Sequence, residues 1–429
     1  METIIPLLTL VVLLVLGVPI AFSLAGAAIL GMWLITGDIH LLLGMAGTAS
    51  YGTVAEYVLS TVPTFVLMAY ITSSTGFARD LFDAAAKWLS PLRGGLAIAT
   101  VFASGVFGAM SGSGVAGASV MSQVAMPHMR RFGYSEELSS GTIAIGATLN
   151  ILIPPSVALI IYGISTETSI AKLFLAGIIP GCIVGSILTV IIILWATLKP
   201  SDAPRPEPVS WSEAWKSLLQ IWPILLLIIV VLGLLYTGTA TPTEVGAIGA
   251  FAATGIGIIL KRLTWAGFIE SVLNTVQITA MIFMIIIGAT LFGYFMTISH
   301  IPYRMVNFII YMDLNRWAII AFIVIAYFIM SMFMDEIPLL LITIEITFPL
   351  IVALGFDPIW YGVLCVMNVA MGLVTPPVGL VGFVVSATAH VDLMKVYKGT
   401  VLLLPALILT TLLLMVFPEI ALWLPSKMN

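Results

Sequence analysis

The sequence predicts an all-α polytopic membrane protein, built as an inverted repeat with about ten spans and two re-entrant hairpins. Three observations predict this fold class. Of 429 residues, 61% are hydrophobic and only 8% are charged, a composition far from that of soluble chains. Apolar runs long enough to cross the hydrocarbon core recur along most of the chain. Proline and glycine pairs in the two halves match at one offset.

Composition also excludes several classes of function. The net charge of −4 is spread along the chain without a basic patch, so no nucleic-acid partner is expected. Cys182 and Cys365 both lie in apolar runs, which excludes a disulfide framework and a cysteine metal site. The first residues lack the basic region and cleavage pattern of a signal peptide, and we interpret them as mature structure.

In the first half, polar breaks such as 79–93 and 165–169 separate five candidate spans: 4–16, 20–36, 57–76, 138–163 and 171–198. Segment 94–129 is too long for one crossing and has a Gly/Ser-rich centre. Two half-length arms that turn at this centre fit better, so we predict a re-entrant hairpin.

The second half repeats this plan with spans at 217–236, 241–260, 276–298, 357–385 and 399–423, and with a hairpin at 316–353. Segments 40–55 and 264–275 precede the third span of each half and are predicted to be in-plane interfacial helices. The proline-rich segment 199–216 is predicted to be a semi-rigid cytoplasmic linker between the halves.

The repeat is visible as a constant spacing. The only two Pro-Pro pairs, at 154–155 and 376–377, are separated by 222 residues. The same offset relates Pro127 to Pro349 and Gly133 to Gly355. Each half has an odd number of full crossings, so the second half enters the membrane inverted. Twelve Lys and Arg residues fall on one side of this topology and four on the other, which places both chain ends outside the cytoplasm.

Each half also combines a hairpin tip with a proline-broken helix. The first tip spans 108–114, and the first break lies within 146–156. The second tip and break lie at 331–338 and 368–377. The prolines remove amide donors and free carbonyls, which are ligands for hard cations, and half-helix N-termini favour an anionic solute. This pairing predicts the site of an ion-coupled transporter, although Pro-Pro and Gly/Ser clusters also occur as ordinary kinks and packing sites.

Four acidic residues are candidates for intramembrane roles. Asp335 and Glu336 lie in the second tip, next to the predicted site. Asp335 is an awkward direct contact for a carboxylate solute, so solute, ion and structural roles all stay open for it. Glu345 and Glu244 are interpreted as structural, because they lie further along the hairpin arm and near an interface.

These motifs together resemble the large membrane subunit, DctM type, of tripartite ATP-independent periplasmic (TRAP) transporters. The resemblance covers essentially the whole chain and rests on 108–114, 149–156, 333–335 and 372–377. It implies a permease, not an enzyme, in the bacterial inner membrane, which imports an organic acid such as a C4-dicarboxylate or a sialic acid by Na⁺ symport. The implied partners are a small four-helix membrane subunit and a periplasmic substrate-binding protein; no organic cofactor is expected.

The resemblance also implies an elevator mechanism, in which a transport domain slides against a scaffold. The scaffold comprises 1–76 and 217–298, and the transport domain comprises 94–163 and 316–385. The connecting span 171–198, the linker 199–216 and the final span 399–423 complete the chain.

Site residues follow from the same resemblance. One sodium site is expected from Ala109, Ser111, Asn150, Ile153 and Ser156, and a second from Ser331, Gly372, Thr375 and Val378. The solute is expected between them, near Ser111, Gly112, Ser113, Asp335, Asn368 and Thr375.

Other classes of function fit the motifs less well. The nearest alternative is a stand-alone ion-coupled carboxylate carrier or antiporter of related architecture. An intramembrane hydrolase built on Ser111 or Ser113 lacks a base, because His128 lies at the far end of the hairpin arm. A structural or receptor subunit would not need paired helix breaks.

Overall fold

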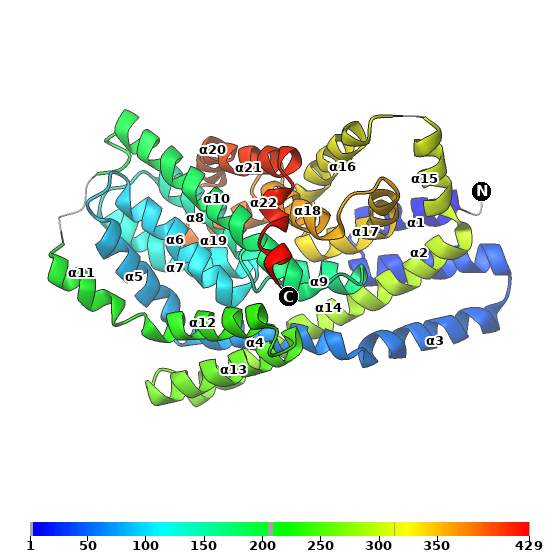
Figure 1. The fold of residues 1–429 in the computed structure, drawn as a ribbon, viewed down its shortest axis with the longest axis horizontal. Helices are drawn as coiled ribbons and strands as arrows, with labels where there is room; N and C mark the ends of the chain where they lie inside the picture. The colour runs from blue at the N-terminus through cyan, green and yellow to red at the C-terminus, as the bar shows by residue number, and fades with distance from the viewer. Residues whose placement is uncertain (1–2, 205–208, 313, 429) are drawn as a thin grey trace.

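The computed structural model describes residues 3–204, 209–312 and 314–428, and within them all regular structure is helical (Figure 1). The predicted all-α fold is confirmed. The first half, up to the linker, contains α1 Ile4–Val15, α2 Ile20–Thr36, α3 Ile39–Ala55, η1 Tyr57–Ser60, α4 Thr61–Ser74, α5 Phe77–Leu89, α6 Gly95–Ser111, α7 Gly114–Arg131, α8 Glu136–Leu152, α9 Val157–Ser165 and α10 Ile170–Leu198.

The second half contains α11 Trp211–Leu218, α12 Trp222–Thr237, α13 Pro242–Ile259, α14 Trp265–Ser299, α15 Ile301–Tyr311, α16 Arg316–Ser331, α17 Glu336–Ala353, α18 Pro358–Gly372, α19 Leu380–Ala389, α20 Leu393–Leu403, α21 Pro405–Val416, α22 Glu419–Leu422 and η2 Pro425–Lys427. By length and composition, seven helices of the described chain are able to cross a membrane, or eight if α11 and α12, bent by 48°, form one span. The chain is therefore a multi-pass membrane protein.

One of the two segments predicted to be in-plane interfacial helices is contradicted by the structure. Residues 264–275 are not a separate in-plane helix, because α14 continues unbroken through them. The predicted break at 79–93 does lie between α4 and α6, but it contains the amphipathic helix α5, which was not predicted. This helix buries Phe77, Leu81 and Phe82, while Asp80 pairs with Arg262. Apolar residues at helical spacing with a charged opposite face form such a helix.

The linker also differs from its prediction. Residues 205–208 lie outside the described residues, and α11 begins inside the predicted linker, where Ser210 caps it. Trp88 of α5 packs edge-on against Trp211 and Trp215, and its indole nitrogen donates to the carbonyl of Ala214 at 2.9 Å. The end of the linker is therefore docked on α5.

The internal repeat is visible in the backbone. The elements α6 to α9 and α16 to α19 follow the same order: two hairpin arms, then a helix interrupted at a Pro-Pro pair. Both Pro-Pro bonds are cis, and Gly133 and Gly355 both have φ of 74°. Only glycine adopts this conformation readily, which explains why the sequence keeps glycine at both turns.

The helices pack in two groups. In one group α2 and α4 lie against α14, and α4 also packs on α13; in the other α8 contacts α6, α7 and α20. Close approach depends on small residues: a Cβ on Gly141 of α8 would lie 2.5 Å from the backbone of Gly399 in α20. Such contacts are typical of membrane helices, where packing rather than the hydrophobic effect holds neighbours together. Helix α4 contacts α6, and α14 contacts α17, which brings the groups together.

Candidate functional site

The tip of the first hairpin is a two-residue turn. Helix α6 ends at Ser111, Gly112 takes a φ of 60°, and the Ser113 hydroxyl caps α7 by accepting from the amide of Ala116 at 3.4 Å. The carbonyl of Gly112 accepts from the amide of Val157 at 3.3 Å. The tip is therefore attached to the first residue of α9.

The first helix break leaves carbonyl oxygens free. In an uninterrupted helix, the carbonyls of Asn150 and Ile151 would accept from residues 154 and 155, but both are prolines and have no N–H. Within the described chain no other donor reaches these two carbonyls. The helix restarts at α9, where the Ser156 hydroxyl accepts from the amide of Leu159 at 3.3 Å.

Asn150 joins this break to the first tip. Its side-chain amide donates to the carbonyl of Ser113 at 3.5 Å, while its Oδ1 is fully buried and has no hydrogen-bond partner in the described chain. Two glycines make the room: a Cβ on Gly108 would lie 2.6 Å from the Asn150 backbone, and one on Gly117 would overlap the Asn150 side chain. A buried amide oxygen without a partner is costly, so Asn150 Oδ1 is a candidate ligand for an ion.

The five residues predicted for the first sodium site lie at this junction. The Ser111 hydroxyl is buried without a partner in the described chain, as Asn150 Oδ1 is. Ala109 follows Gly108 on the buried face of α6, and Ile153 is the first residue beyond α8. The Ser156 hydroxyl is already used as a helix cap, which leaves only its backbone or a second lone pair for an ion.

The second tip is wider and acidic. Helix α16 ends at Ser331, α17 begins at Glu336, and Asp335 accepts from the Glu336 amide at 2.8 Å. The carbonyl of Met332 accepts from the amide of Gly379 at 3.0 Å, which attaches this tip to the start of α19. The tip-on-break arrangement of the first half is thus repeated.

At the second break most of the oxygens have donors. The carbonyl of Gly372 accepts from Thr375 and that of Leu373 from Val381, both at 3.0 Å, while the Tyr397 hydroxyl donates to the carbonyl of Val378. The Thr375 hydroxyl donates to the carbonyl of Met371, in the last turn of α18, at 2.7 Å.

The residues predicted for the second sodium site lie around this break. Ser331 is in direct contact with Gly372, where a Cβ would overlap its hydroxyl. The Ser331 hydroxyl lies within 3.3 Å of the carbonyl of Asn368. Asn368 was predicted beside the solute, but the structure places it next to Ser331. Its Nδ2 donates to the carbonyl of Leu364 at 3.0 Å, and its Oδ1 is buried with no partner in the described chain.

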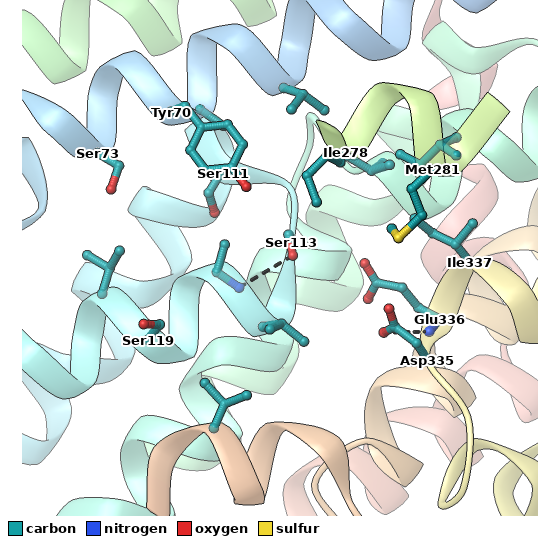
Figure 2. Close-up of a pocket in the computed structure, with 18 of the residues that line it drawn as sticks. Tyr70, Ser73, Ser111, Ser113, Ser119, Ile278, Met281, Asp335, Glu336 and Ile337 are labelled. Atoms are coloured by element: carbon teal, nitrogen blue, oxygen red, sulfur yellow. Dashed lines mark hydrogen bonds between the residues drawn. The ribbon is translucent and has the colours of Figure 1, made fainter. Parts of the chain in front are cut away.

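Between the two tips lies a cavity of about 500 Å³. It is lined by residues of α4, α6, α7, α9, α14, α17 and α19 and of both tips. Figure 2 shows Ser111 and Ser113 on one side and Asp335 and Glu336 on the other. Of the residues predicted beside the solute, Ser111, Ser113 and Asp335 line this cavity, whereas Gly112, Asn368 and Thr375 do not.

Several lining residues were missed from the sequence. Tyr70 and Ser73 of α4, Ser119 of α7 and Met281 of α14 all face the cavity. The sequence did contain a pattern that marks Tyr70 and Ser73. The lining residues of α4 are spaced three and four apart, so they share one helix face. No comparable signal marked α14, because its lining residues are apolar like their neighbours.

The comparisons with known proteins identify the family of the chain. A family model, described as the tripartite ATP-independent periplasmic transporter, DctM component, matches residues 7–420. The chain belongs to the DctM family. The resemblance inferred from the motifs is confirmed, and the chain is a TRAP transporter large permease subunit.

Individual relatives support the assignment. The C4-dicarboxylate TRAP transporter large permease protein DctM of Pseudomonas aeruginosa is 34% identical over 88% of both chains. The sialic acid TRAP transporter large permease protein SiaM of Vibrio cholerae is 30% identical over 96% of both. These DctM proteins are transporter permease subunits rather than enzymes. Family membership implies a substrate-binding protein and a small membrane subunit as partners.

Among solved structures, the crystal structure of the Alcanivorax borkumensis YdaH transporter superposes with a TM-score of 0.69. The two chains share 15% sequence identity, and the match covers 90% of each chain. At this identity the similarity concerns the fold alone.

Proposed function

We propose that this DctM-family chain is the permease subunit of a Na⁺-coupled, binding-protein-dependent symporter that imports an organic acid across the bacterial inner membrane. One observation carries the proposal. Two junctions between a hairpin tip and a broken helix flank one cavity, and each contains an asparagine Oδ1 that is buried without a partner in the described chain. Inverted repeats with broken helices are typical of secondary transport sites.

Sodium fits these junctions chemically. Hard cations prefer oxygen ligands, and neutral carbonyl, amide and hydroxyl oxygens suit a monovalent ion better than clustered carboxylates do. At the first junction the free carbonyls of Asn150 and Ile151, Asn150 Oδ1 and the Ser111 hydroxyl are available. At the second junction we assign Asn368 Oδ1 to the ion rather than to the solute, together with Ser331.

The solute is proposed to bind in the cavity, next to both junctions. There Ser111 and Ser113 offer hydroxyls, and the N-termini of α7 and α9 offer partial positive charge to a carboxylate. Relatives named for a C4-dicarboxylate and a sialic acid support an organic acid as the class of solute.

An elevator movement is the proposed mechanism. The cavity wall combines α4 and α14, from the segments predicted as scaffold, with the two hairpins and α19, from the segments predicted to move. Sliding of 94–163 and 316–385 along α4 and α14 would carry the solute and its ions together. A small subunit of about four helices would enlarge the scaffold, and a periplasmic binding protein would deliver the solute.

The test is uptake of labelled organic acids into proteoliposomes that contain this chain, its small subunit and the cognate binding protein. We expect uptake to require both an inward Na⁺ gradient and the binding protein. Equal uptake without either would overturn the proposal and favour a stand-alone carrier. Uptake that needs the binding protein but follows a proton gradient would overturn the sodium assignment.

A further inference from the structure

The charges that line the cavity are all of one sign. Among its described lining residues the charged side chains are Asp335 and Glu336, and none is Lys, Arg or His. Both carboxyl groups point into the cavity from the second tip (Figure 2). The helix N-termini and the proposed sodium ions can meet a solute carboxylate, but they do not account for two acidic side chains that face the solute.

Glu336 is not used by the surrounding protein. Only 4% of its surface is exposed, and its Oε2 is buried with no hydrogen-bond partner in the described chain. Helix capping does not explain this carboxyl, because Asp335 accepts from the first amide of α17. A buried carboxylate is retained at such a position when a cation or a strong donor meets it.

The opposite wall has the opposite character. There Ser113 caps α7 and Val157 begins α9, so two helix N-termini with their partial positive charge border the cavity. The Ser111 hydroxyl on the same wall is buried and without a partner in the described chain. The cavity is therefore polarised, with donors on the first hairpin and carboxyl oxygens on the second.

We infer that the solute is an organic acid that also carries a cationic group, such as an ammonium. The solute carboxylate lies toward Ser111, Ser113 and the N-termini of α7 and α9. Its cationic group lies toward Glu336, with Asp335 beside it. Glu336 is then a specificity-determining residue, because it favours a zwitterion over a dicarboxylate. This inference rests on the proposed function, since it names the solute class of the same cavity.

A second explanation is that Glu336 is protonated and donates a hydrogen bond to a solute carboxylate. This arrangement would also account for a buried Glu336 carboxyl group. The two explanations differ in their response to Glu336→Gln. Glutamine keeps a neutral donor, so it would preserve carboxylate binding, but it removes the negative charge that a cationic group requires.

The experiment measures thermal stabilisation of the purified complex of this chain with its small subunit, in Na⁺-containing nanodiscs. The probes are 4-aminobutyrate, succinate and N-acetyl-4-aminobutyrate, which have similar four-carbon chains but end in an ammonium, a second carboxylate or a neutral amide. We expect 4-aminobutyrate to stabilise the complex at a concentration about tenfold lower than either of the others. In Glu336→Gln this preference should be lost, whereas Glu270→Gln, at an exposed position of α14, should keep it.

Stabilisation by succinate at an equal or lower concentration, or by none of the three probes, overturns the inference. A preference that survives Glu336→Gln also overturns it. The comparison of the three probes on the wild-type complex needs no variant. The inference can therefore be tested even if the Glu336→Gln protein folds poorly. Uptake that still requires Na⁺ and the binding protein, without preference for a zwitterion, would refute this inference and leave the proposed function intact.

Discussion

The two tip-and-break junctions share a backbone plan but differ in the oxygens that they leave free. At the first, the carbonyls of Asn150 and Ile151 have no donor in the described chain. At the second, the corresponding carbonyls of Gly372 and Leu373 accept from Thr375 and Val381. Repetition has therefore preserved geometry while the chemistry of the two halves has diverged.

The asparagines show the same divergence. Asn150 corresponds to Gly372 at the offset of 222, and Asn368 lies one helical turn before that position. Each half thus supplies one buried amide oxygen, but at a different height along the broken helix. From this difference we expect an ion at the first junction to be held by backbone and side-chain oxygens together, and an ion at the second junction mainly by side-chain oxygens.

The largest effect is expected from Gly117→Ala. The added Cβ overlaps the Asn150 side chain, so Asn150 must move away from the break, and we expect Na⁺-dependent uptake to fall by roughly a hundredfold. Gly185→Ala is the matched control, because no atom lies within 4 Å of its Cβ. Uptake by the two variants is compared at equal amounts of protein in the membrane. Equal uptake would show that transport does not depend on where the Asn150 side chain lies.

Asn150→Ala and Asn368→Ala test the two junctions against each other. Asn150→Ala removes an oxygen proposed to bind an ion at the first junction. We expect it to raise the Na⁺ concentration that gives half-maximal uptake by about tenfold. We expect a smaller rise, about threefold, for Asn368→Ala, because the neighbouring oxygens of that break already have donors. Identical shifts would remove the proposed difference between the junctions.

Ser156→Ala tests the cap that only the first break has, since the corresponding residue in the second is Val378. Loss of the hydroxyl that accepts from Leu159 should destabilise the protein by about 1 kcal/mol. The melting temperature of the purified complex reports this loss. An unchanged melting temperature would show that α9 does not depend on its cap.

Tyr397→Phe is the counterpart at the second break and should have the smallest effect. It removes the hydroxyl that donates to the carbonyl of Val378, at a cost of about 0.5–1 kcal/mol in stability. Tyr311→Phe, at a position that is 89% exposed, is the control. If both variants melt at the same temperature, Tyr397 does not stabilise the second break.

Much of the fold was predictable from the sequence, because its strongest signals are local. Proline has no N–H wherever it lies, so the breaks at 154–155 and 376–377 were located correctly. Hydrophobicity distinguished the embedded segments but not their ends: the apolar residues of 264–275 continue into α14 without a break, and charged residues hid the helix α5.

The site was predictable only in part, because its contacts join distant segments. The Gly/Ser tip indicated that Ser111 and Ser113 face a cavity, and both do. The spacing of 222 residues does not reveal that Asn368 lies against Ser331, since its counterpart in the first half is Gly146. Nor does it reveal Tyr70, which reaches the cavity through packing between α4 and the first hairpin.

The most direct test of the account is binding of radioactive sodium to the purified complex, with wild-type chain and with the double variant Asn150→Ala/Asn368→Ala. The account predicts saturable sodium binding by the wild type and its loss in the double variant, with Gly185→Ala binding as the wild type does. Sodium binding that is unchanged in the double variant would contradict the assignment of the ions to the two junctions.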